Sequence, residues 1–116
     1  MQKVYLSVPS ACISQVFIDN HYQDVKNKFI SIGYDVIDNI GIFIPQNVQY
    51  FNIFRLSENV KLISQCNLIY FFSNWEHDPL CKLEHEIACQ FFMPCYYECG
   101  FDLVPVVNNH SLKKEI

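Results

Sequence analysis

The chain has 116 residues, of which 51% are hydrophobic and 17% charged, which indicates one folded domain over residues 1–116 and excludes intrinsic disorder. Its formal net charge of −4 gives no basic surface for a nucleic-acid backbone, which excludes that class of partner. The apolar run at the N-terminus is too short for a signal peptide, and no stretch approaches a membrane span, so we expect a cytoplasmic protein without a membrane partner.

Strands and helices are predicted to alternate along the chain. The predicted strands are residues 3–8, 34–38, 67–72, 94–98 and, as a fifth, 101–106. The predicted helices are residues 12–32, 51–66 and 79–92. Gly33 is placed to end the first helix. Residues 39–52 are apolar but contain Gly41 and Pro45, and we expect a long loop there, with or without a short strand.

This alternation predicts an α/β domain with a doubly wound, flavodoxin-like or Rossmann-like parallel sheet of four to five strands and helices on both faces. The continuous apolar run 67–72 is typical of a strand covered on both faces. Ligands of such sheets bind at the carboxyl ends of the strands, where the strand order reverses. With three glycines, the chain has no G-x-G-x-x-G or Walker loop, and we expect no organic cofactor.

The six cysteines do not predict a metal site. Their spacings include no C-x-x-C, and Cys95 and Cys99 are the nearest to a pair. "LEHEIAC" lacks the second histidine of H-E-x-x-H. We therefore expect reduced thiols, most of them acting as small buried apolar side chains, and no metal.

The segment "SNWEHDPLCKLEHEIACQFF" (73–92) places charged residues just before and within a predicted helix. Asp78 followed by Pro79 predicts the helix start. The spacing of Leu83, Ile87 and Phe91 at i, i+4 and i+8 predicts the buried stripe. Glu84, one step round from that stripe, is expected to point into the crevice at the edge of the sheet.

Other residues of this segment have two interpretations each. His85 and Glu86 are expected to project into solvent. Trp75 and His77 precede the helix near the same crevice, where they either contact a ligand or serve as a packing Trp and a surface His. Asp78 is either a plain N-cap or a site residue.

The order "KVYLSVPS", "GYDVID" and "LISQCNLIYFFSNWEHDPLCKLEHEIA" resembles the nucleoside 2-deoxyribosyltransferase superfamily, and within it a small bacterial and phage branch of uncharacterised domains. That branch reads roughly S-G-P, G-Y-x-V-x-N-P, C-D-x-I-Y and W-x-x-S-x-G-A-x-x-E-x-x-x-A, and the resemblance covers about residues 3–97.

The resemblance implies roles for individual residues. Glu84, followed by Ala88 at the family's spacing, matches the glutamate that attacks the sugar C1′. Asp78 matches an acidic residue that contacts the substrate, and Tyr5 matches a tyrosine that hydrogen-bonds near the nucleophile. The expected substrate-binding residues are Trp75, His77, Ser7, Pro9 and Asp38.

The sequence also departs from the family pattern. Val8 stands where the family has the glycine of S-G-P, Leu80 and Cys81 replace its G-A pair, and Cys66-Asn67 replaces C-D. Glycines let a sugar approach the backbone, so Val8 and Leu80 are expected to narrow the pocket.

Three classes of function remain open. The first is an enzyme that cleaves or transfers the N-glycosidic bond of a nucleoside or nucleotide through a glutamate nucleophile. The second is an inactive nucleoside- or nucleotide-binding module, which Val8, Leu80 and Cys81 favour. The third is an oligomeric interaction protein. A negative Asp78 at the helix N-terminus occupies a natural anion site, which favours an uncharged glycoside over a 5′-phosphorylated one.

A homo-oligomer, in the form of a dimer, is expected from the aromatic content. Aromatic pairs at 71–72, 91–92 and 96–97 are more than one small core is expected to cover. The transferases that the chain resembles close each other's sites with C-terminal residues, for which Asn108 and Asn109 are the candidates.

Overall fold

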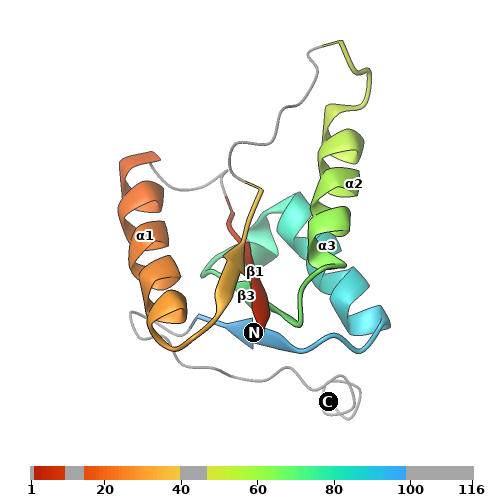
Figure 1. Ribbon diagram of the computed structural model, residues 1–116. Coiled ribbons are helices and arrows are strands. Elements are labelled where there is room, and N and C mark those ends of the chain that lie inside the picture. The colour runs from red at the N-terminus through yellow and green to blue at the C-terminus, as the bar shows by residue number, and fades with distance from the viewer. Residues whose placement is uncertain (1, 10–14, 40–46, 99–116) are drawn as a thin grey trace.

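The computed structural model of the protein describes residues 2–9, 15–39 and 47–98 (Figure 1). The strands are β1 (Lys3–Ser7), β2 (Asp35–Ile37), β3 (Leu68–Phe71) and β4 (Cys95–Tyr97). The helices are α1 (Gln15–Ser31), α2 (Phe51–Ile63) and α3 (Pro79–Gln90), with a short 3₁₀ helix η1 (Trp75–His77) before α3.

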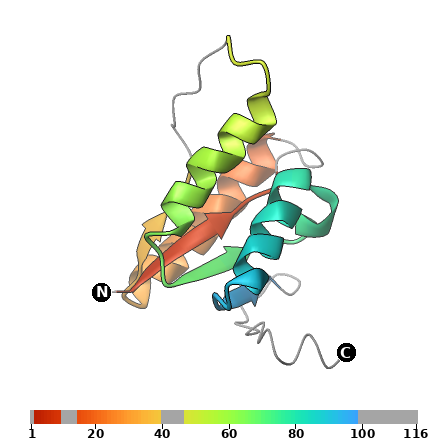
Figure 2. The same cartoon turned by 90° about the vertical axis from the view of Figure 1, so that its right-hand side faces the viewer.

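All four strands are parallel, in the order β2-β1-β3-β4. Figure 2 shows α2 and α3 in front of the sheet and α1 behind it, so helices cover both faces. This flavodoxin-like arrangement confirms the predicted α/β class. Because β2 lies on one side of β1 while β3 and β4 lie on the other, the strand order reverses between β1 and β3, where ligands of such folds bind.

The core has two layers because successive strand residues point to opposite faces of the sheet. On the α1 face, Val4, Leu6 and Tyr70 pack against Val25 and Phe29 of α1. The buried residues on the opposite face are Tyr5, Ile63, Ile69, Phe71, Ala88 and Cys95. The predicted burial of 67–72 on both faces is confirmed, since every residue from Leu68 to Phe72 is buried.

The end of α1 is set by Gly33, whose φ of +98° lies in the left-handed region that favours glycine. The amide of Tyr34 donates to the carbonyl of Phe29 at 3.0 Å, and the amide of Gly33 donates to Ile30 at 3.0 Å. These bonds satisfy carbonyls of the last turn, as in a glycine-ended helix. The predicted C-cap is confirmed.

The predicted buried stripe of α3 is wrong. Leu83 and Phe91 are 47% and 75% exposed, whereas Glu84 and His85 are 2% and 8% exposed. His85 was expected in solvent, and that prediction is also wrong. The inward face of α3 is instead Cys81, Glu84, His85 and Ala88. Glu84 and His85 can be buried there because residues of β1 and β4 supply hydrogen-bond partners for their side chains. A spacing rule that considers only apolar residues does not detect such partners.

Several boundaries differ from the predictions. The helix predicted for 51–66 begins at Phe51 as expected but ends at Ile63, and the helix predicted for 79–92 ends at Gln90. The predicted strand 101–106, and Asn108 and Asn109, lie outside the described residues. In the part of the chain that the structure describes, no helix combines the length and apolar character needed to cross a membrane.

Candidate functional site

The site is built on the junction between β3 and α3. Asp78 has an extended backbone (φ −108°, ψ 120°), and its side chain accepts a hydrogen bond from the amide of Cys81 at 3.0 Å. Pro79 at the first helical position needs no backbone donor. The Asp-Pro pair therefore fixes where α3 starts. It thereby also fixes the position of Glu84, in the second turn of that helix, relative to β1.

Glu84 is the centre of the site. Its side chain lies against the α2–α3 face of the sheet, where the Ser7 hydroxyl donates to Oε1 at 2.5 Å and the Tyr5 hydroxyl donates to Oε2 at 3.1 Å. Both donors come from β1, and Ser7 is its last residue, at the carboxyl end of the strand. The predicted proximity of Tyr5 and Glu84 is confirmed, although they are 79 positions apart in the sequence.

A third donor, Asn59, comes from α2. Its amide donates to Oε2 of Glu84 at 2.8 Å, and its carbonyl oxygen accepts from the amide of Asn39 at 3.1 Å. The carboxylate of Glu84 only accepts hydrogen bonds, so the NH₂ group of Asn59 faces it and the carbonyl oxygen faces Asn39. Sequence reasoning missed Asn59. The available signal was a polar residue four positions before the inward-facing Ile63, on the same side of the helix.

The surroundings of Glu84 act on its pKa in opposite directions. Burial raises it above its ordinary value, the hydrogen bonds from Ser7, Tyr5 and Asn59 lower it, and the nearby charge of Asp78 raises it. The net direction is upward, because taking a carboxylate out of water costs more than three donors return.

The neighbouring hydroxyl and thiol groups stay protonated. Burial raises the pKa of Tyr5, and the adjacent Glu84 raises it further. Burial likewise raises the pKa of the Cys81 thiol. Tyr5 therefore acts as a hydrogen-bond donor to Glu84, and Cys81 is an unreactive wall of the site.

The other predicted site residues lie at various distances from this cluster. Trp75 is half-buried and packs on His85, with ring centroids 4.3 Å apart, and on Phe71 at 5.2 Å. His77 is exposed in η1. Pro9 is buried just after β1, and Asp38 is half-buried just after β2. The structure brings together Tyr5, Ser7, Asp78 and Glu84. The catalytic and substrate-binding roles of all the predicted site residues stay predictions.

His85, which the sequence analysis placed in solvent, belongs to an aromatic cluster beside Glu84. Its Nε2 lies 2.5 Å from the hydroxyl of Tyr97, and its ring packs edge-on against Phe71 at 5.2 Å. The thiol of Cys89 lies 3.6 Å from the same Nε2. These contacts tie α3 to β4 and account for the burial of a titratable ring.

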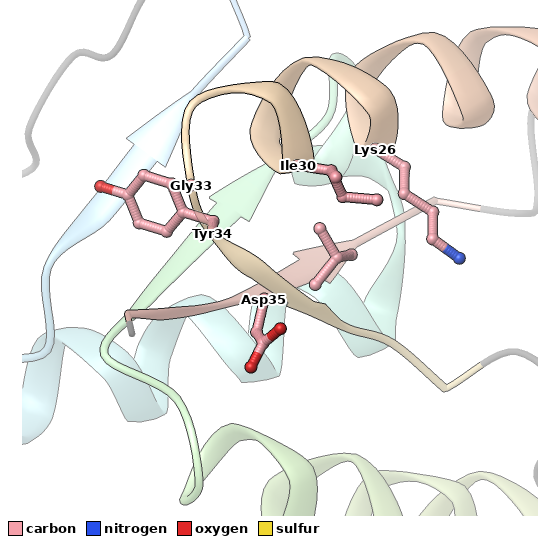
Figure 3. Close-up of a pocket in the computed structure, with 6 residues that line it drawn as sticks. Lys26, Ile30, Gly33, Tyr34 and Asp35 are labelled. Carbon is pink, nitrogen blue, oxygen red and sulfur yellow. The ribbon is translucent and has the colours of Figure 1, made fainter.

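A surface pocket of about 340 Å³ lies elsewhere, between the end of α1 and the edge strand β2 (Figure 3). Val36, one of its walls, belongs to the α1 face of the sheet, opposite the face that holds Glu84. In Figure 3 the amine of Lys26 and the carboxylate of Asp35 point away from each other. The pocket therefore gathers no set of polar groups, and its chemistry is unrelated to the Glu84 cluster.

The described residues contain no group of three or more His, Cys, Asp or Glu side chains arranged to hold a metal ion. What the Glu84 arrangement offers is a single carboxylate, fixed by neutral donors at the edge of the sheet where the strand order reverses. Such a group can act as a nucleophile or stabilise a positive charge that develops on a bound molecule.

One family model matches the chain. It is described as a domain of unknown function (DUF4406), and the match runs over residues 2–97, from the residue before β1 to the end of β4. Comparison with curated proteins gave no match, and comparison with solved structures gave none either.

Proposed function

We propose that this chain, which belongs to the family described as a domain of unknown function (DUF4406), cleaves or transfers the N-glycosidic bond of a nucleoside or nucleotide, with Glu84 as the nucleophile. The observation that carries the proposal is the Glu84 carboxylate held by Tyr5, Ser7 and Asn59 at the carboxyl end of β1. This is the position at which parallel sheets of this kind bind ligands.

The hydrogen bonds at Glu84 suit it to nucleophilic attack. Three donors hold the carboxylate in one orientation, and no lysine or arginine among the described residues forms an ion pair with it. A carboxylate held by neutral donors keeps more nucleophilicity than one neutralised by a cation. The resemblance to the deoxyribosyltransferases, in which the residue matching Glu84 attacks the sugar, supports the same role.

The reaction then proceeds in two steps. Glu84 forms a bond to the anomeric carbon while the C–N bond breaks, and the base leaves with the bonding electrons and accepts a proton from His77 or solvent. In the second step water or a second base attacks the anomeric carbon and gives up a proton to the same donor. The ester bond breaks, and Glu84 recovers its electron pair. Trp75 is the candidate to stack on the base.

Incubation with a panel of nucleosides and nucleotides, with chromatographic detection of free base, tests the proposal. Glu84→Gln keeps the size of the side chain and removes the nucleophile, so base release should fall by roughly 10³-fold or more. Glu86→Gln is the matched control, because Glu86 is exposed on the same helix. Intact-mass measurement should show the sugar attached to the wild-type chain and not to the Glu84→Gln variant. Base release that survives Glu84→Gln would refute the proposal.

A second candidate function is binding without turnover. It is favoured by the 2% exposure of Glu84, together with the buried Cys81 beside it, because a substrate must reach the carboxylate before attack. Under this alternative, a nucleoside or nucleotide would raise the melting temperature of the wild type and of Glu84→Gln alike, and no base would be released from either.

A further inference from the structure

Arg55 is the only arginine of the chain, and the proposed reaction has not yet used it. It lies on α2, four residues before Asn59, so both side chains leave the same side of the helix. Asn59 contacts Glu84 directly, which places Arg55 one turn from the site. Figure 1 shows the first turns of α2 rising past the carboxyl ends of the strands. These turns of α2 carry Arg55, one turn before Asn59.

Arg55 is half-buried, and its guanidinium is not engaged by an acid among the described residues. The described residues give it no hydrogen bond or ion pair, and the nearest acid on its own helix, Glu58, is paired with Lys61 at 2.9 Å. Glu84 and Asp78 accept their hydrogen bonds from other groups. Its five N–H donors are thus left for a group outside these residues.

The charge of Arg55 nevertheless acts on one residue of the Glu84 cluster. It acts on the Tyr5 hydroxyl and lowers its pKa, against the larger upward effects of burial and Glu84. This effect and the position of Arg55 one turn before Asn59 both put its charge on the α2 side of the Glu84 cluster.

The positions at which an anion can bind are limited. At the N-terminus of α3 the Asp78 carboxylate already takes the amide of Cys81, so a phosphate there would meet a negative charge. At the start of α2 the preceding residue, Tyr50, gives the first-turn amides no side-chain hydrogen bond. The partial positive charge of that helix end adds to the charge of Arg55. Both charges on the α2 side therefore favour an anion over a cation.

We propose that Arg55 binds the phosphate of the substrate, so that the molecule whose glycosidic bond faces Glu84 is a nucleoside 5′-monophosphate. This inference rests on the proposed function and selects one of its two substrate classes. It reverses the preference for an uncharged glycoside that Asp78 suggested in the sequence. Asp78 closes only the α3 end of the site, whereas Arg55 supplies a fork of donors that matches phosphate oxygens on the other side.

The test compares a nucleoside with its own 5′-monophosphate in calorimetric binding and in base release. Wild type should bind the monophosphate about 10- to 100-fold more tightly, which is the gain expected from a charge-assisted Arg–phosphate pair. Arg55→Gln should abolish that preference while leaving nucleoside binding unchanged, and Arg55→Lys should retain part of it. Lys61→Gln, an exposed cation on the same helix, is the matched control and should change nothing.

The outcomes separate this inference from the proposed function. If base is released but Arg55→Gln keeps the preference for the monophosphate, or if wild type has no preference, the inference fails and the glycosidase proposal stands. If no base is released, yet the monophosphate binds in an Arg55-dependent way, the phosphate assignment stands and the glycosidase proposal fails. Inorganic phosphate alone should bind far more weakly than the monophosphate. Equal binding would overturn the assignment to a nucleotide, as would no binding of either ligand.

Discussion

Asn59 provides the sharpest test of how the site is held together. It is 1% exposed and joins two hydrogen bonds in series, from Asn39 to Asn59 at 3.1 Å and from Asn59 to Glu84 at 2.8 Å. Leucine has nearly the shape of asparagine but neither donor nor acceptor. Asn59→Leu therefore removes both bonds with little change in volume and leaves a buried carboxylate with two donors in place of three.

The expected loss of stability follows from the two bonds. A hydrogen bond to a charged group contributes about 1.5–3 kcal/mol, and a neutral one about 0.5–1.5 kcal/mol. The apolar surface of leucine offsets part of this loss, and we expect Asn59→Leu to lower the free energy of unfolding by about 2–4 kcal/mol at pH 7. For a domain of this size that corresponds to roughly 8–16 °C in melting temperature.

The loss should also depend on pH. Asn59 lowers the pKa of Glu84, so removing it raises a folded-state pKa that burial already holds above the ordinary 4.5. A raised folded pKa means stability that is present below the unfolded pKa and is lost as pH rises through the folded pKa. The difference between Asn59→Leu and wild type should therefore be small near pH 4 and grow toward neutral pH.

Urea unfolding of both proteins from pH 4 to pH 8 measures this difference. Asn52→Leu is the control, because Asn52 is exposed on the same helix, and its effect should stay within about 0.5 kcal/mol. If Asn59→Leu is as mild as Asn52→Leu at pH 7, or if its cost does not change with pH, the hydrogen bond to an ionised Glu84 does not contribute as argued.

Three further predictions follow from the same contacts and exposures. Glu84→Gln should gain stability relative to wild type as pH rises above the ordinary value of 4.5, because only the wild type must ionise a buried carboxyl, and a constant difference from pH 4 to pH 8 would contradict this. In the native protein at pH 8, iodoacetamide should leave Cys81 unmodified and modify Cys66 slowly, since burial raises the pKa of Cys66 to about 11; denatured, non-reduced protein should titrate as six thiols, and a stable disulfide would overturn the expectation of reduced thiols. Light scattering should give a dimer of twice 13.7 kDa, and a wild-type mass near 13.7 kDa would refute the dimer. Phe92→Glu should convert the dimer to a monomer, because Phe92 is 66% exposed. Phe92 also has a left-handed φ of 61°, which costs a bulky residue about 1–2 kcal/mol.

The fold was predictable because its signals are local. The apolar run that became β3 needs no knowledge of its neighbours, and Gly33 marks the end of α1 through its own backbone freedom. Helices alternating with such strands leave few arrangements other than a parallel sheet covered on both faces. Boundaries were displaced by a few residues, because they depend on hydrogen bonds of the last turn that spacing does not encode.

The inward face of α3 was not predictable from the same rules. Helical spacing assigns apolar residues to the core, and by that rule Leu83 belongs inside, while Glu84 lies one step round from the buried stripe. Glu84 is inside because Tyr5 and Ser7, 79 and 77 positions away, supply its donors. The resemblance to the deoxyribosyltransferases predicted that Tyr5 and Glu84 lie together, and the hydrogen bond between them agrees with that prediction. Asn59 matched no motif residue, and only its contact with Glu84 reveals it.

The charges around Glu84 bear on the proposed chemistry. A buried ion pair that only joins elements of a core can often be replaced by apolar residues of similar volume. Here Glu84 is held by neutral donors from β1 and α2, while the cation nearest to the site, Arg55, is left without an acid of its own among the described residues. Under our proposals, an ion pair between Arg55 and Glu84 would neutralise the nucleophile and leave the phosphate of the substrate without a partner. The separation of the two charges therefore agrees with the proposals that Glu84 attacks the anomeric carbon and that Arg55 binds the phosphate of a nucleoside 5′-monophosphate.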